Sequence, residues 1–384
     1  MVTVANRNLS SGATLTQRLP AALTPFDVAL RSLIDGLQPV VCIDTLLAHC
    51  VGVTAAEIAL LQVPHSAVRI AVSDGWALRA RDTVGASSYS PVPMAAPPLW
   101  VEAGDRLPVG CNCVLDAEMV EKTGPLFQIV AEAIPGQGLR RAADNVSNIP
   151  PGRLMNLFDV LAARGAGIDR IQVRSPRVGI IDVPSADGST ATSRFVQEFA
   201  TASGARAVWS QAGGRDAASI HTALSRSVCD LIVTVGGTGL GRTDATIEAL
   251  AVSGCRLMHG LALEPGRTAA VGKIDTRPII AAPGASDQAL AVCLMLLQPA
   301  LDRLSKRSPR HAIVRPLARK ISSSIGVAEI VLLGILNETW VPIAVGQLSL
   351  EAIGRAEAWL AVPGNSEGYA AGTEIGAFFL RDVI

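Results

Sequence analysis

The stretch Leu231–Leu250, LIVTVGGTGLGRTDATIEAL, holds the residues of this chain best suited to bind a ligand. Four of the six residues from Gly236 to Gly241 are glycines, and they separate an apolar run from a helix-like pattern. Glycine permits positive φ and carries no Cβ, so backbone N–H groups can approach an anion at the positive end of the following helix. Two hydroxyls and two carboxylates flank the glycines, those of Thr234, Thr238, Asp230 and Asp244. The spacing therefore predicts a loop that binds an anionic ligand.

Two nucleotide-binding patterns fit this loop poorly. GGTGLGRT has the spacing of a P-loop, but Arg242 stands where that motif places the compact ammonium of a lysine. The glycines at 237, 239 and 241 are evenly spaced, which does not match G-x-G-x-x-G. A plain strand-to-helix turn, capped by Thr243 or Asp244 for about 1 kcal/mol, is the structural alternative. Four glycines are more than such a turn requires.

The elements that must position this loop alternate along the chain. Strands are predicted at Arg177–Val183, Arg206–Ser210 and Asp230–Val235, and helices at Thr192–Ala202 and Asp216–Val228. RPIIAA, PGAS and DQALAVCLMLLQPALDRL then repeat strand, turn and helix. This order predicts a mostly parallel sheet with helices on both faces, and ligands bind such sheets at the carboxyl ends of the strands.

Other segments have a different texture. Pro25–Leu37 has the apolar rhythm of a helix, and Asn156–Gly165 is also predicted helical. Short apolar runs broken by proline and glycine, from Ile70 to Ile134 and again after Ile313, predict β-rich parts. We expect an α/β multidomain protein with a helical linker part at 1–65 and 140–174, a β-rich domain at 66–139, the α/β domain at 175–305 and a C-terminal β module at 306–384.

Composition excludes several classes of function. The 33 basic and 33 acidic side chains cancel without forming a basic block, so no nucleic acid partner is expected. The two most apolar regions are interrupted by proline, glycine and acidic residues, which argues against a membrane span. Seven scattered cysteines fit buried thiols in a reducing cytoplasm. Neither the cysteines nor the five histidines have convincing ligand spacing, so the metal ligands stay unassigned.

Several motifs resemble known proteins. VTVGGTGLGRTDATIEAL resembles the T-T-G-G-T-G molybdopterin-binding motif of molybdopterin adenylyltransferases and their relatives. SDGWALRARD, Ser73–Asp82, is similar to M-D-G-Y-A-x-R-x-x-D of the MoeA/gephyrin-E-type molybdopterin molybdotransferases. ALEPGRTAAVGKI, Ala262–Ile274, and the APGAS segment with its helix resemble two further stretches of that family. The resemblance runs from about Phe26 to the C-terminus and points to a divergent member.

The resemblance implies a function and a fold. The family inserts molybdate into adenylylated molybdopterin with Mg²⁺ and releases AMP and the molybdenum cofactor. It forms homodimers whose site is shared between subunits, and each subunit ends in a β-barrel. Molybdoenzymes are possible further partners. By resemblance, Asp74 of the partner subunit and Asp244 are catalytic, and the substrate-binding residues are Asp230, Thr234, Gly236, Gly237, Thr238, Gly239, Arg267, Lys273, Pro283, Gly284 and Ser286.

The chain also departs from the family pattern. Its T-G-D-E segment should fall near residues 183–186, where this chain reads DVPSADG, so Asp182 and Asp187 flank a missing glutamate. P-G-N-P has become Pro283–Ser286, and Glu264 stands where the family has a lysine. Losing a carboxylate can abolish Mg²⁺-assisted transfer, since Mg²⁺ is held by few protein carboxylates. The alternative is therefore a degenerate paralogue that binds or carries molybdopterin without inserting metal. The adenylyltransferase reaction is a third possibility, suggested by the loop alone.

Overall fold

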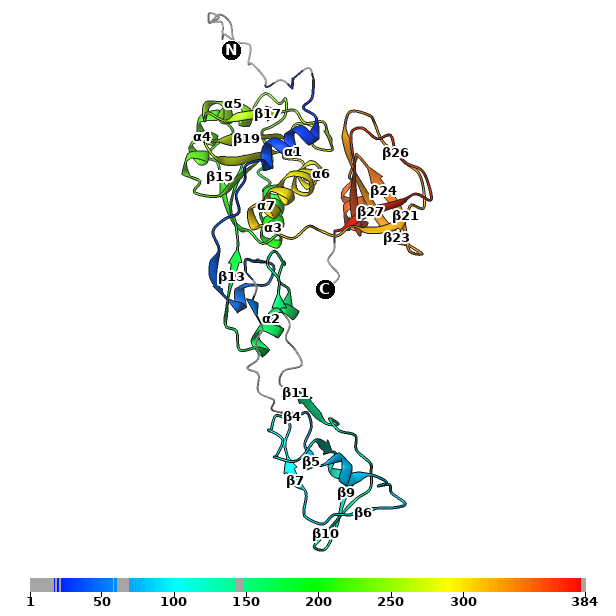
Figure 1. Ribbon diagram of the computed structural model, residues 1–384. Coiled ribbons are helices and arrows are strands. Elements are labelled where there is room, and N and C mark those ends of the chain that lie inside the picture. Colours follow the sequence, from blue (N-terminus) through cyan, green and yellow to red (C-terminus); the bar gives the residue numbers. More distant parts are fainter. Residues whose placement is uncertain are drawn as a thin grey trace, which may run out of the picture. The chain divides into compact units, whose positions relative to one another are not determined.

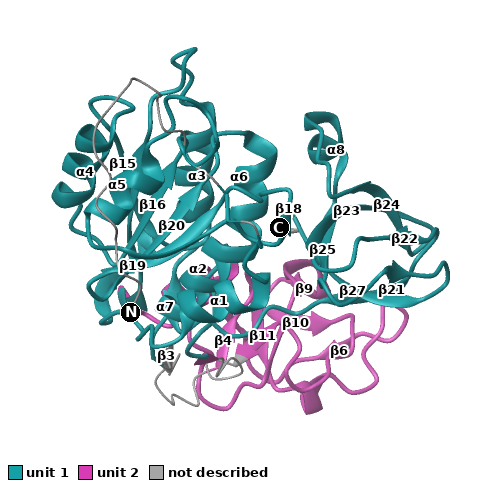
Figure 2. Ribbon diagram, turned by 90° about the horizontal axis from the view of Figure 1, so that it is seen from above, with its two compact units in different colours: residues 1–57, 150–157, 170–384 teal, residues 58–149, 158–169 magenta. Residues whose placement is uncertain are grey.

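The computed structural model describes residues 17, 19–20, 22–57, 59–60, 69–141 and 148–380. The chain forms two compact units, one of residues 1–57, 150–157 and 170–384 and the other of residues 58–149 and 158–169 (Figure 2). The first contains the α/β sheet and the C-terminal β part. In the described residues, no helix is both long and apolar enough to cross a membrane. The predicted four-part division, whose first part includes residues outside the described ones, stays a prediction.

A six-stranded sheet forms the centre of the first unit, in the order β15-β14-β16-β20-β19-β17. Figure 1 labels β15, β17 and β19 of this sheet. Its strands are β14 Arg177–Asp182, β15 Arg206–Gln211, β16 Leu231–Val235, β17 Arg256–His259, β19 Ala270–Ile274 and β20 Arg277–Ala282. The first four in spatial order pair in parallel, while β19 and β17 run antiparallel at one edge. The sheet is thus mixed, and its four parallel strands include those predicted from the sequence.

Helices cover both faces of this sheet because, after β15, the chain crosses back past β14 and adds β16 on the other side of that strand. The helices are α3 Ala191–Ala202, α4 Ala217–Arg226, α5 Thr246–Val252, α6 Ser286–Val292 and α7 Gln298–Ser305, with a π-helical turn Cys293–Leu297 between the last two. One apolar core joins α3 and α6 to one face, and a second joins α4 and α5 to the other. Figure 2 shows the two helix layers on either side of the strands. The strand order reverses between β14 and β16, which is where such sheets leave a crevice.

Two further parts of the first unit flank the α/β sheet. Helix α1 Phe26–Ile34 buries Ala29 and Leu33 in the core that contains α3 and α6. A three-stranded sheet, β1-β13-β2, is built from β1 Ile43–Leu46, β2 Thr54–Ala55 and β13 Arg170–Arg174. Together with α2 Leu157–Gly165, which belongs to the second unit except for Leu157, these elements occupy the segments expected to form a helical linker.

The C-terminal part is a β-sheet packed on the α/β core. Its elements are β18 Leu263–Glu264, β21 Ile313–Pro316, β22 Ile321–Ser322, β23 Ala328–Leu336, β24 Thr339–Val345, α8 Leu350–Arg355, β25 Ala358–Val362, β26 Gly368–Tyr369 and β27 Glu374–Phe379. The order is β18-β23-β25-β27-β21, with β24 on β23 and β22 paired with β26. A single bridge from Leu317 to Trp340 joins the two sides, and no ladder closes the described strands, so the expected barrel is not confirmed.

The second unit consists of short strands and turns. Its strands are β3 Ala59–Leu60, β4 Arg69–Ala71, β5 Gly75–Leu78, β6 Val92–Pro93, β7 Leu99–Val101, β8 Cys113–Leu115, β9 Val120–Thr123, β10 Leu126–Ile129, β11 Leu139–Arg141 and β12 Asn148–Ile149. They form the sheets β7-β5-β8, β6-β10-β9, β11-β4 and β12-β3. Gly75 is required by packing, because a Cβ there would lie 2.2 Å from the carbonyl oxygen of Leu115.

Candidate functional site

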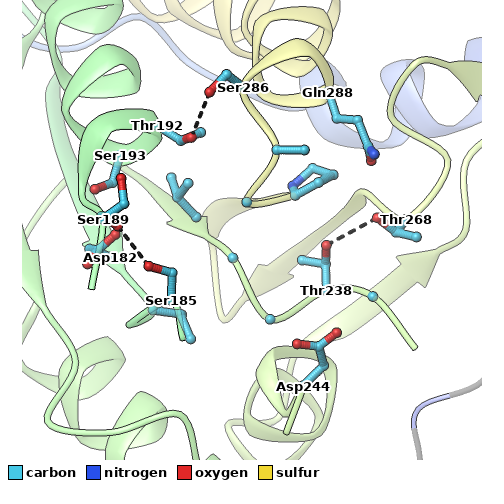
Figure 3. Close-up of a pocket in the computed structure, with 18 of the residues that line it drawn as sticks. Asp182, Ser185, Ser189, Thr192, Ser193, Thr238, Asp244, Thr268, Ser286 and Gln288 are labelled. Carbon is cyan, nitrogen blue, oxygen red and sulfur yellow. Dashed lines mark hydrogen bonds between the residues drawn. The ribbon is translucent and has the colours of Figure 1, made fainter. Parts of the chain in front are cut away.

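A cavity of about 570 Å³ lies at the carboxyl ends of β14, β16 and β20, at the strand-order reversal. Its volume falls within the range usual for small-molecule sites. The residues that converge there come from the loops after β14, β16 and β20 and the helices that follow them, together with Arg215 before α4 and Thr268 before β19 (Figure 3). The lining residues are Asp182, Val183, Ser185, Asp187, Ser189, Ala191, Thr192, Ser193, Arg215, Val235, Gly236, Gly237, Thr238, Gly239, Asp244, Thr268, Pro283, Gly284, Ala285, Ser286 and Gln288.

The glycines fix the shape of the loop after β16. Gly236 and Gly237 have φ of +101° and +68°, which favour glycine. A Cβ on Gly237 would lie 2.5 Å from Oγ1 of Thr246, and one on Gly239 would lie 2.8 Å from Oδ2 of Asp244. The glycines are thus needed to fold the loop tightly against the start of α5. The loop therefore needs more glycines than an ordinary strand-to-helix turn does.

Backbone polarity along the loop is asymmetric. The carbonyl oxygen of Gly236 accepts the hydroxyl of Thr246 at 2.8 Å, and that of Thr238 lies 3.1 Å from Nε2 of His259. The carbonyls of Gly237 and Gly239 are hydrogen-bonded as well. By contrast, the N–H groups of residues 237–240 have no hydrogen-bond partner within the described part of the chain. Gly237, Thr238 and Gly239 line the cavity, and successive free amides beside a cavity are an arrangement that binds anions.

Two helices begin at the cavity without side-chain caps. Neither Thr190 before α3 nor Ala285 before α6 makes a side-chain cap bond, whereas Asp216 caps α4 elsewhere in the sheet layer. The hydroxyls of Thr192 and Ser286, in the first turns of these helices, lie 3.0 Å apart (Figure 3). Uncapped helix N-termini carry partial positive charge. The cavity therefore gathers hydrogen-bond donors on three sides.

Charged side chains of both signs also line the cavity. Asp182 is buried and accepts a hydrogen bond from Gln211 at 2.8 Å. The Ser185 hydroxyl and the Ser189 N–H hold the pKa of Asp187 below its usual range. These two acids flank the missing family glutamate, and both reach the cavity.

Arg215 is the one cation among the described lining residues. Its guanidinium donates to Oδ1 of Asp244 at 3.1 Å and to the carbonyl of Pro184 at 2.9 Å. Its Nε is buried without a partner in the described structure. Asp244 also accepts the Gly241 N–H at 3.0 Å, so its carboxylate braces the loop.

Most of the residues expected to bind substrate come together at this cavity. Those that line it are Gly236, Gly237, Thr238, Gly239, Pro283, Gly284 and Ser286, and Asp244, which was expected to be catalytic, lines it as well. Thr234 is fully buried inside β16, among the strand's core residues. Asp230 precedes β16, at the opposite end of the strand from the cavity, and pairs with Arg177 at 3.0 Å. Strand direction thus separates Asp230 from the loop that follows it in sequence.

The other expected residues lie outside the cavity lining. Arg267 pairs with Glu264 at 3.3 Å on the surface. Lys273 pairs in register with Pro278 near the start of β20, away from the strand's carboxyl end, and its Nζ donates to the Asp35 carbonyl at 2.9 Å. Asp74 belongs to the second unit, where Oδ1 accepts the Ala103 N–H at 2.7 Å. Its carboxylate therefore fixes a turn there.

The residues present do not make a protein-held magnesium site. In the described part of the chain, no three His, Cys, Asp or Glu residues come close enough to hold a metal ion. The cavity acids are already engaged by Gln211, by Ser185 and by Arg215. Any Mg²⁺ here would take most of its ligands from phosphate and water.

Sequence reasoning missed several lining residues. Arg215, Thr268, Gln288 and the Ser185–Ser193 polar segment come from loops that are distant in sequence from the glycines. The one available signal was position, because PSADGST follows the first parallel strand and AGGRD follows the second.

Comparisons with known proteins find similarity to proteins of molybdopterin biosynthesis. Residues 186–303 match the family model described as probable molybdopterin binding domain. A putative molybdopterin biosynthesis protein of Methanocaldococcus jannaschii is 22% identical over 347 residues, covering 81% of this chain and 85% of that protein. Molybdopterin molybdenumtransferase 2 of Mycobacterium tuberculosis is 26% identical over 59% of this chain and 66% of its own length.

A solved structure supplies the fold. The molybdopterin biosynthesis moeA protein from Pyrococcus horikoshii OT3 superposes with a TM-score of 0.69 at 22% identity, covering 93% of this chain and all of that one. The chain therefore shares the fold of this moeA protein over nearly its whole length, and within that fold residues 186–303 match the molybdopterin binding domain model.

Proposed function

We propose that this protein acts in molybdenum cofactor biosynthesis and holds adenylylated molybdopterin in the cavity beside Gly236–Gly239, where molybdate is inserted. The observation that carries the proposal is the row of free N–H groups at residues 237–240, at the switch point of a parallel sheet. Molybdopterin bears a phosphate, and its adenylylated form bears a pyrophosphate. Either anion suits free amides and uncapped helix ends.

The chain's own residues would bind and orient this ligand. The amides of residues 237–240 and the first turns of α3 and α6 face phosphate oxygens, and Arg215 neutralises part of their charge. Hydroxyls of Thr192, Thr238 and Ser286 supply further donors. Because the residues do not fit a protein-held Mg²⁺, we derive no step through that ion.

The direct test is turnover. Purified protein, adenylylated molybdopterin, Mg²⁺ and molybdate should release AMP faster than a protein-free control. Bound ligand without AMP release would reject the transferase while keeping the binding site. A run with ATP and unmodified molybdopterin checks for the adenylyltransferase reaction, which we do not expect.

The second candidate is a carrier that binds molybdopterin or the finished cofactor without chemistry. It is favoured by the state of the acids, since Asp182 and Asp244 are engaged by Gln211 and Arg215. A carrier predicts tight binding that is unaffected by Asp74→Ala. Loss of AMP release in that variant, with binding intact, would instead assign Asp74 to the chemistry.

The finer expectations belong to this proposal. They are a homodimer with a shared site, in which Asp74 of the partner subunit meets the loop, a C-terminal β-barrel, Mg²⁺ as a reactant-held ion, a cytoplasmic location and molybdoenzymes as clients. Substrate binding by Arg267, Lys273 and Asp230 stays a prediction, and in the described structure these residues contact Glu264, the Asp35 carbonyl and Arg177. The oligomeric state can be measured by light scattering, and a monomer with full activity would reject the shared site.

A further inference from the structure

Gln17 contacts the cavity loop from more than 200 residues away in sequence. Its Nε2 donates to the carbonyls of Gly237 at 3.0 Å and Gly239 at 2.9 Å. Its Oε1 accepts the N–H of Ile247, in the first turn of α5, at 2.8 Å. One carboxamide thus uses both of its ends on the loop and on the helix that follows it.

These contacts control where the loop's amides point. In a trans peptide the carbonyl of one residue and the N–H of the next point in opposite directions. Drawing the carbonyls of Gly237 and Gly239 toward Gln17 therefore turns the N–H groups of Thr238 and Leu240 the other way. Gln17 is not among the cavity-lining residues, whereas Gly237, Thr238 and Gly239 are. The Thr238 amide consequently faces the side on which a ligand in the cavity would lie.

The chain after Gln17 is anchored beside the loop. Thr24 forms a bridge to Leu261, and its N–H donates to the carbonyl of Gly260 at 2.8 Å. A Cβ on Gly260 would lie 2.9 Å from the ring of Pro20, so this segment packs closely on that turn. His259, one residue earlier, binds the carbonyl of Thr238. Gln17 is thereby held at the loop before any ligand arrives.

We propose that Gln17 is a positioning residue that presents the Thr238 amide to a phosphate or pyrophosphate group in the cavity. The inference rests on the proposed function only for the identity of the ligand. Without these bonds, the carbonyl of Gly239 would have no partner in the described structure and that of Gly237 would keep only the Thr246 N–H at 3.1 Å, so both carbonyls could turn more easily toward the anion and repel it. Preorganised donors bind more tightly because they need no reorientation.

The Thr238 amide can be observed directly by NMR. The sequence contains two Gly–Thr pairs, Gly237–Thr238 and Gly372–Thr373. Labelling glycine carbonyls with ¹³C and threonine amides with ¹⁵N selects these two amides alone, so Thr373 serves as an internal reference. Inorganic pyrophosphate is the probe, added to the full-length protein and to the Gln17→Leu variant. Gln38→Leu is the matched control, because Gln38 is exposed and makes no side-chain hydrogen bond within the described structure.

We expect pyrophosphate to shift Thr238 and leave Thr373 unmoved, and Gln17→Leu to weaken this binding about tenfold, the effect of losing one to two hydrogen bonds. Gln38→Leu should bind as the wild type does. Equal affinity in wild type and Gln17→Leu, or no Thr238 shift in the wild type, would overturn the inference. A Thr238 shift with pyrophosphate, but none with adenylylated molybdopterin, would support the role of Gln17 and reject the proposed function. Unfolding temperatures of all three proteins separate positioning from loss of fold.

Discussion

Asp244 and Arg215 illustrate how side chains from different loops share one task. The carboxylate joins the glycine loop, through Gly241, to the loop before α4, through Arg215. The pair is partly shielded, with 16% of the acid and 30% of the arginine side chain exposed. Such a pair can hold the loop in place and still offer positive charge to a ligand. Asp244 is therefore as well suited to bracing the site as to catalysis.

Arg215→Met should weaken binding of adenylylated molybdopterin by roughly 10- to 100-fold, since a hydrogen-bonded charge in a cavity contributes about 1.5–3 kcal/mol. Arg215→Lys should recover only part of the loss, because an ammonium cannot make the forked contacts to Asp244 and Pro184 together. Calorimetric titration measures both variants. Wild-type affinity in Arg215→Met would show that the arginine is only structural.

His259 makes the stability of the fold depend on pH. Burial lowers the pKa of His259 below its ordinary value, against the opposing effect of the Thr238 and Thr268 carbonyls. The unfolded chain, with a pKa of about 6.5, then binds the proton first as pH falls. Stability should therefore decline as pH drops through about 6.5 and level off below the folded pKa. In His259→Gln the unfolding midpoint should change less between pH 7.5 and pH 5.5 than it does in the wild type. An equal change in both proteins would contradict this account.

The sequence predicted the glycine loop's position because one local pattern specifies it. It could not place Asp230, since the two ends of a five-residue strand lie far apart in space though close in sequence. Nor could it find Gln17 or Arg215, which reach the loop only through the assembled fold. Side chains that act across long sequence separations leave no periodic signal.

Among the elements, the loops after β16 and β20 play different parts. Gly237 lies at positive φ with Thr246 against it, while Gly284 has only the Cα of Gly236 in ordinary contact at 3.5 Å from an added Cβ. One glycine shapes the loop, and the other leaves space in the cavity.

Gly237→Ala should destabilise the protein by about 1–2 kcal/mol from the strained φ alone, and weaken binding as a consequence. Gly284→Ala should leave the free energy of unfolding within about 0.5 kcal/mol but reduce affinity for adenylylated molybdopterin by about tenfold, because its methyl group enters the cavity. Gly213→Ala is the control, since an added Cβ there meets nothing within 4 Å. Denaturant unfolding and titration measure both quantities, and equal affinity in Gly284→Ala would place the ligand elsewhere.

Elements with strong local patterns were predicted within a few residues, as for β14, β20 and α3. The antiparallel strands β17 and β19 were not, because RLMH and AVGKI are too short to stand out in the sequence and owe their pairing to neighbouring strands. The open C-terminal sheet likewise depends on which edges meet, which single strands do not encode.

At the scale of the molecule, the C-terminal sheet and α1 share one apolar core with the α/β sheet. Ile330, Leu332 and Trp359 pack in the cluster that also contains Leu33 and Leu294. The cavity's scaffold is thus supported by chain segments from both ends of the sequence. The expected shared site would add a second chain to this support.

A mixing experiment tests that expectation. Asp74→Ala and Arg215→Met each alter one side of the proposed site, and each variant alone should lose most AMP release. If Asp74 of the partner subunit serves the cavity, a refolded one-to-one mixture forms mixed dimers in half of the population. One of the two sites in each mixed dimer is intact, so about a quarter of wild-type activity should return. If each chain supplies its own Asp74, mixing restores nothing. The control is each variant incubated separately, so that no subunits exchange. Activity in this control would show that the variants were not inactive at the start.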